Sequence, residues 1–69
     1  MDIKVKMPGH IRFYTVKEGD RVETGAQIAS MEALRMEHKL TAPVGGIVKK
    51  ILAPVNERIS TGTVIMTIG

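Results

Sequence analysis

The chain has 69 residues, a net charge of +3 at pH 7 and no cysteine. This length forms one small domain with a limited core, and the lack of cysteine excludes disulfides and thiolate metal sites. His10 and His38 lack metal-ligand spacing, so no metal site is expected. No apolar run approaches the roughly 20 residues of a membrane span, and the first residues lack the features of a signal peptide. We therefore expect a cytoplasmic or organellar-matrix protein with no membrane partner.

Short β-strands are predicted along the whole chain, because apolar and β-branched residues alternate with polar ones. The alternating segments are DIKVKM (2–7), IRFYTVK (11–17), GGIVKKI (45–51) and TVIMTI (63–68). They are divided by residues that favour turns, in PGH, KEGD, ETG, PVGG, PVNE and STG. Short strands that are separated by closely spaced turns predict a small all-β sandwich or barrel.

An internal repeat relates the two halves of the chain. The segments EGDRVETGAQI (18–28) and VNERISTGTVI (55–65) carry matching residues 37 positions apart. Gly19 matches Asn56 in this alignment, and both residue types readily adopt positive φ, so the match is structural as well as compositional. The copies extend from about 3–31 and 40–68, which predicts a symmetric β sandwich with a pseudo-twofold axis.

The junction between the two copies, residues 32–39, is predicted to form a hairpin. Its sequence, within SMEALRMEHK, contains no Gly, Pro or Asn, and the residues that it does contain also favour a helix. We favour the hairpin because the repeat places this segment between strands. Leu34 and Arg35 would then lie near a tip that forms at some conformational cost and exposes Leu34 and Met36. His38 is expected to be a surface residue of a strand.

The hairpin sequence resembles the EAMKM signature of biotin carrier domains in the biotinyl/lipoyl family. MEALRM (31–36) carries the signature, MPGHI (7–11) resembles the family's MPG-x-V, and the flanking GD-x-V-x-x-G and AP-x-x-G-x-V motifs follow in order. The resemblance implies one carrier domain over residues 1–69. It also implies a flattened β barrel, of the barrel-sandwich hybrid type, made of two four-stranded antiparallel sheets with quasi-twofold symmetry.

The resemblance also implies a function in carrying carboxyl groups. In the family, a lysine at the hairpin tip takes biotin through an amide bond, and the domain moves the cofactor between the sites of a carboxylase or decarboxylase. The implied partners are a biotin protein ligase and the biotin carboxylase and carboxyl-transferase components. The methionines beside the tip resemble the biotin class rather than the lipoyl class. Four residues match the positions read by the ligase or partners: Glu32, Ala33, Leu34 and Met36.

Arg35 stands where the family has its acceptor lysine. Attack on an activated acyl group needs a neutral amine, whereas the delocalised guanidinium stays protonated, with a pKa above about 12, and is a poor nucleophile. Lys39 is the nearest lysine that could replace it as acceptor. It lies four residues further on, roughly 13 Å along an extended strand at about 3.3 Å per residue, so a ligase that reads the tip should not reach it. We therefore predict that biotin, the implied cofactor, is absent from this chain and that Arg35 marks a non-acceptor form.

Two other functions remain open from the sequence. The domain could be a cofactor-free interaction or structural module whose tip contacts a partner. A small basic barrel that binds RNA is disfavoured because Phe13 and Tyr14 are the only aromatic residues, so no nucleic acid partner is expected. Independent catalysis is not expected, because no nucleophile with a base, phosphate loop or acid pair is present.

Overall fold

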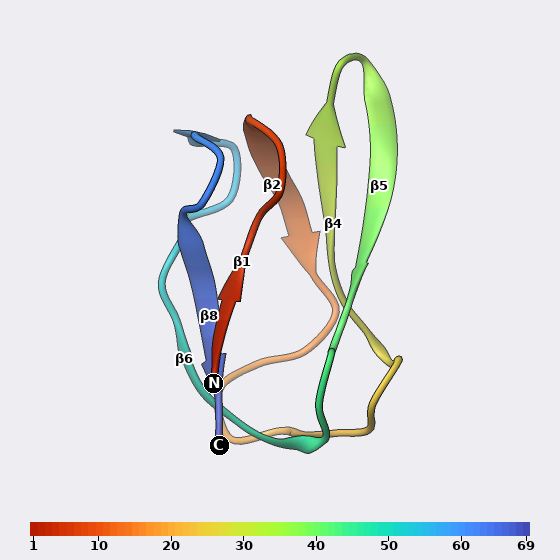
Figure 1. Ribbon diagram of the computed structural model, residues 1–69, viewed down its shortest axis with the longest axis vertical. Coiled ribbons are helices and arrows are strands. Elements are labelled where there is room, and N and C mark those ends of the chain that lie inside the picture. Colours follow the sequence, from red (N-terminus) through yellow and green to blue (C-terminus); the bar gives the residue numbers. More distant parts are fainter.

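The computed structural model describes residues 1–69 and contains only β-strands and turns. The strands are β1 (Asp2–Lys4), β2 (Gly9–Tyr14), β3 (Arg21–Val22), β4 (Gln27–Ala33), β5 (Met36–Thr41), β6 (Gly46–Ile51), β7 (Arg58–Ile59) and β8 (Val64–Ile68). They form two four-stranded antiparallel sheets with the orders β1-β8-β6-β3 and β5-β4-β2-β7 (Figure 1). The predicted all-β sandwich is confirmed, and the structure has no helix that could cross a membrane.

The two sheets are related by quasi-twofold symmetry. Exchanging β1 with β5, β2 with β6, β3 with β7 and β4 with β8 converts the order of one sheet into that of the other. The pairing follows the same relation, because Gly9 of β2 lies opposite Ile59 of β7, and Gly46 of β6 lies opposite Val22 of β3. The symmetric sandwich predicted from the spacing of 37 residues is therefore the architecture observed.

The matching turns have matching backbone conformations. Gly19 has φ of 93° and Asn56 has φ of 64°, so both occupy the left-handed region. Gly25 and Gly62 have φ of 87° and 88°. An L-residue with a branched side chain is strained in this region, and Gly and Asn are the residues that tolerate it best. The predicted equivalence of Gly19 and Asn56 is confirmed.

The core lies between the two sheets and is built from the inward-facing residues of both. Alternation along each strand sends every second side chain toward the opposite sheet, and small bulges in the β2–β4, β4–β5 and β6–β8 pairs shift this alternation locally. The buried apolar residues are Ile3, Val5, Ile11, Val22, Ile28, Ala29, Met31, Ala33, Ala42, Val48, Ala53, Ile65, Met66 and Ile68. The core contains no aromatic residue, so aliphatic side chains and methionines fill the space between the sheets.

The two chain ends lie side by side at one end of the molecule. The amide of Ile68 donates a hydrogen bond of 2.9 Å to the carbonyl of Met1. The β4–β5 hairpin projects from the other end of the molecule, whose longest dimension is 30 Å (Figure 1). The tip of the hairpin is therefore far from both termini.

Tyr14 joins the end of β2 to the segment after β6. Its hydroxyl donates a 2.7 Å hydrogen bond to the carbonyl of Ala53. Burial of the phenol raises the pKa of Tyr14 above its ordinary value of 10.0, because burial disfavours the charged phenolate. The neutral phenol is thus favoured by folding more than the phenolate is.

Because the folded-state pKa of Tyr14 is raised, its contribution to stability is present below pH 10.0 and is lost as the pH rises through that pKa. Tyr14→Phe should lower the free energy of unfolding at neutral pH by about 1 kcal/mol, through the lost hydrogen bond. The variant should also lose less stability than the parent above pH 10.0. Urea unfolding at several alkaline pH values measures both effects. An equal loss in the two proteins above pH 10.0 would contradict the assignment.

Candidate functional site

The candidate site is the tip of the hairpin formed by β4 and β5. The last pair of the ladder is Ala33 with Met36, so only Leu34 and Arg35 form the turn. Their φ angles are 54° and 63°, which places two successive residues in the left-handed region. A two-residue hairpin turn with this geometry normally contains Asn or Gly. The segment is therefore a hairpin and not a helix, and the turn is strained.

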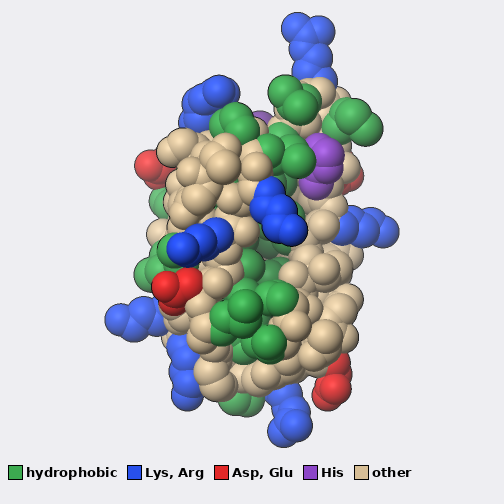
Figure 2. Space-filling model, in the orientation of Figure 1, with side chains coloured by type: hydrophobic (Ala, Val, Ile, Leu, Met, Phe, Trp, Pro, Cys, Tyr) green, Lys and Arg blue, Asp and Glu red, His purple; other side chains and the backbone are tan.

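The tip itself is exposed to solvent, whereas residues of β4 that lead to it are buried in the core. The residue exposure is 81% for Leu34 and 63% for Met36, whereas Met31 is 1% exposed and Ala33 is 3% exposed. Arg35 is also exposed and makes no ion pair. Figure 2 shows apolar and cationic side chains together at this end of the molecule. The tip thus presents an apolar pair with a free cation between its two members.

Polar contacts at the base of the hairpin join it to β2. Oε1 of Glu32 lies 3.5 Å from the Arg12 guanidinium and 3.9 Å from Nε2 of His10. Within the hairpin, the hydroxyl of Ser30 on β4 donates a 2.6 Å hydrogen bond to Oε2 of Glu37 on β5. Glu32 and Glu37 lie directly opposite one another, an arrangement that is unfavourable for like charges. The contacts with Arg12 and Ser30 offset this repulsion and hold the base of the hairpin in place.

The structure separates the residues that the sequence singled out. Leu34, Arg35 and Met36 lie together on the exposed tip, and Glu32 is half-buried at the base. Ala33 packs inside the core, so its side chain is not available to a partner without local opening. Lys39 lies opposite Ser30 in the middle of the hairpin, away from the tip.

His38 differs from the expectation of a surface position. The residue is half-buried on β5, and its Nε2 atom is buried without a hydrogen-bond partner. It lies beside a pocket of about 530 Å³ between β1 and β5. Sequence reasoning missed this pocket because the two strands belong to different sheets and share no sequence motif. No group of three or more potential metal-binding side chains is present.

Comparison with known proteins defines the family. A family model described as "Biotin-requiring enzyme" (biotin/lipoyl) matches residues 1–68. The chain is 30% identical over 66 residues to the biotin/lipoyl attachment protein of Bacillus subtilis, covering 96% of this chain and 90% of that protein. The chain therefore belongs to the biotinyl/lipoyl family, and the resemblance read from the sequence is confirmed.

Larger relatives contain this domain as a small part. The chain is 43% identical over 51 residues to the methylcrotonoyl-CoA carboxylase alpha subunit of Dictyostelium discoideum, covering 74% of this chain and 7% of that protein. Its structure superimposes on Kluyveromyces lactis urea carboxylase with a TM-score of 0.93 and 25% identity, covering 100% of this chain and 6% of that one. The lipoyl domain of the Azotobacter vinelandii 2-oxoglutarate dehydrogenase complex shares the fold, with a TM-score of 0.80 and 16% identity over 97% of this chain and 95% of that one. Among these relatives, the chain thus resembles the carrier domains of carboxylases.

The strain at the tip can be tested directly. Arg35→Gly should raise the free energy of unfolding by about 1 kcal/mol, because glycine removes the steric penalty of the left-handed conformation. Met36→Gly is the matched control: it changes an exposed residue of the adjacent strand and should lower stability by about 0.5–1 kcal/mol. Urea unfolding should give the highest free energy of unfolding for Arg35→Gly, an intermediate value for the parent and the lowest for Met36→Gly. Equal destabilisation by both glycines would show that the turn is not strained.

Proposed function

We propose that this chain is a carrier-type domain of a biotin-dependent carboxylase or decarboxylase in which Arg35 replaces the acceptor lysine. The observation that carries the proposal is the position of Arg35, exposed and unpaired in the two-residue tip of the hairpin. The match of the biotin/lipoyl family over nearly the whole chain and the similarity to carboxylases support it.

The chemistry of the tip argues against attachment of biotin. In the attachment reaction, the lone pair of a neutral lysine amine forms an amide bond with the acyl carbon of biotinyl adenylate, AMP leaves, and the amine gives up a proton. The guanidinium of Arg35 has no comparable lone pair because its charge is delocalised and it stays protonated. When bound, biotin would supply the nitrogen that carries the carboxyl group. Here the tip offers only a cation and the flanking apolar side chains.

Five residues of the hairpin have proposed roles in this function. Arg35 occupies the acceptor position, and exposed Leu34 and Met36 are the contacts for a ligase or a carboxylase component. Glu32 adds a carboxylate at the base, and Ala33 fixes the strand against the core. Such a domain would still dock on a biotin protein ligase and on biotin carboxylase or carboxyl-transferase partners, without transferring a carboxyl group.

The test is intact mass after incubation of the chain with biotin, ATP and a biotin protein ligase. We expect no gain in mass under conditions that fully modify an authentic carrier domain included as a positive control. Peptide mapping would locate any modification. A biotinyl group on Arg35 or on Lys39 would overturn the proposal.

A second function, a cofactor-free interaction module, is favoured by the exposure of Leu34 and Met36. Leu34→Asp should then abolish capture of a partner that co-purifies with the parent chain, because it places a charge in an apolar contact. The fold should be unaffected, since Leu34 is 81% exposed and lies outside the core. Retention of such a partner by Leu34→Asp would exclude the tip as its contact.

A further inference from the structure

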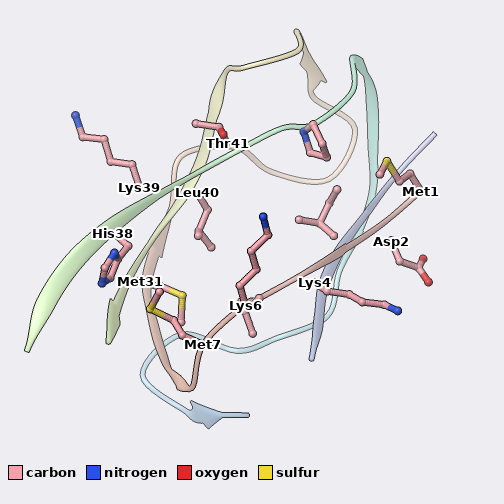
Figure 3. Close-up of a pocket in the computed structure, with 13 residues that line it drawn as sticks. Met1, Asp2, Lys4, Lys6, Met7, Met31, His38, Lys39, Leu40 and Thr41 are labelled. Carbon is pink, nitrogen blue, oxygen red and sulfur yellow. The ribbon is translucent and has the colours of Figure 1, made fainter. Parts of the chain in front are cut away.

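The pocket between β1 and β5 is separate from the tip of the hairpin. Its lining includes the consecutive residues 1–7 on one side and 38–41 on the other, but none of residues 34–36. The first segment contains β1 and the bend that follows it, and the second lies within β5, so their consecutive residues line an elongated groove. Its volume of about 530 Å³ is within the usual range for binding sites. Figure 3 shows side chains from both segments around this groove.

The floor of the groove is apolar and flexible. Met7 and Met31 lie next to one another, with Leu40 beside them (Figure 3). Methionine side chains adapt to partners of different shape. His38 adjoins this floor, and its unpartnered Nε2 is a polar atom that a bound molecule or water could satisfy.

The charges around the groove are mostly positive and uncompensated. Lys4, Lys6 and Lys39 line it, whereas Asp2 is its only acidic residue, and none of these lysines makes an ion pair. In Figure 3, the side chain of Lys6 extends across the pocket toward Leu40, and those of Lys4 and Lys39 extend away from its centre. The groove therefore complements a molecule that combines apolar groups with negative charge.

Both flanking strands are edges of their sheets. β1 pairs only with β8, and β5 pairs only with β4, so each has one side without a strand partner. Free strand edges offer backbone donors and acceptors to an added extended segment. An extended polypeptide uses the length of the groove, its apolar floor and its free edges together, whereas a small anion uses only the charge and the floor.

We propose that the β1–β5 groove binds an extended polypeptide segment with alternating apolar and acidic side chains. The segment adds to the free edge of β5, places its apolar side chains on the methionine floor and places its carboxylates near Lys6. This proposal does not depend on the state of Arg35, because no residue of the tip lines the groove.

The test uses three fluorescent hexapeptides with the complete chain. One alternates leucine and glutamate, the second alternates leucine and lysine, and the third has the first sequence with N-methylated peptide bonds. Fluorescence anisotropy should show binding of the first peptide only, weaker at higher salt. Lys6→Gln should weaken that binding about two- to five-fold, the range of an exposed ion pair. The matched control is Lys50→Gln, which removes an exposed cation outside the groove and should leave the affinity unchanged.

Amide chemical shifts locate the bound peptide. We expect changes over residues 2–7 and 38–41. Shifts centred on residues 34–36, binding of the lysine peptide with equal affinity, or no binding of any peptide at millimolar concentration would overturn the proposal. Equal binding of the N-methylated peptide would overturn the proposed addition to the edge of β5. Binding of octanoate to the same residues as tightly as the acidic peptide would instead assign the groove to small amphipathic anions.

Discussion

Arg35→Lys is expected to convert the chain into a substrate of a biotin protein ligase. The substitution restores a side chain that can lose its proton and attack biotinyl adenylate, and it leaves the charge of the tip unchanged. The hairpin geometry should persist, since lysine and arginine face the same penalty at φ of 63°. Intact mass should change from no biotinyl group to one, and peptide mapping should place that group on residue 35.

Two controls separate chemistry from folding in this experiment. Arg35→Gln should remain unmodified, because it removes the charge without adding an amine. Arg35→Lys should have the same free energy of unfolding as the parent to within about 0.5 kcal/mol, as expected of an exposed substitution. Failure of folded Arg35→Lys to gain biotin would show that the hairpin is not a ligase substrate, and the proposed carrier function would then be wrong.

Gly9→Ala is expected to have the largest effect on stability. A Cβ at this position would lie 2.2 Å from the carbonyl oxygen of Glu32 and 3.1 Å from the Cβ of Ala33. The first distance is far inside van der Waals contact and involves backbone, so β2 must move away from β4. We expect a loss of about 3 kcal/mol and a Tm lower by roughly 12–24 °C, because each 1 kcal/mol shifts Tm by about 4–8 °C in a domain of this size. Thermal and urea unfolding measure the loss.

Gly45→Ala is the matched control for Gly9→Ala. A Cβ at Gly45 would find its nearest atom, the carbonyl oxygen of Val22, at 3.4 Å, and the residue does not have a positive φ. Its effect should therefore stay within about 1 kcal/mol in either direction. If the two alanine variants lose the same free energy of unfolding, the close approach of β2 to β4 does not explain the need for glycine at position 9.

The sandwich could be predicted because two independent signals in the sequence agree. Alternation indicated strands, and the repeat indicated how they are arranged, with Gly19 and Asn56 at equivalent turns in the structure. The tip could be predicted in the same way, although Leu34 and Arg35 carry no local turn signal. Helix propensity favoured the wrong structure for this segment because it counts intrinsic preferences and neglects the pairing of β4 with β5.

The remaining features depend on contacts between distant residues. Ala33 looked like part of a recognition surface, but the pleat of β4 turns it into the core. His38 looked like a surface residue, but it is partly buried beside the groove, with its Nε2 atom shielded from solvent. The groove itself arises where the edges of two sheets meet, and no property of β1 or β5 alone would indicate it. Alternation in the sequence therefore predicts which face of a strand a residue lies on more reliably than it predicts a groove formed between two sheets.

The adjacency of the two chain ends has a mechanical consequence. Where such a domain is part of a longer polypeptide, both connections leave from the end opposite the tip. The domain is then attached only at the ends of β1 and β8. Rotation of the domain about this point of attachment moves the tip through an arc whose radius approaches the 30 Å length of the domain. A few residues of flexible connection would then let the tip visit separate docking sites while the sandwich itself stays rigid.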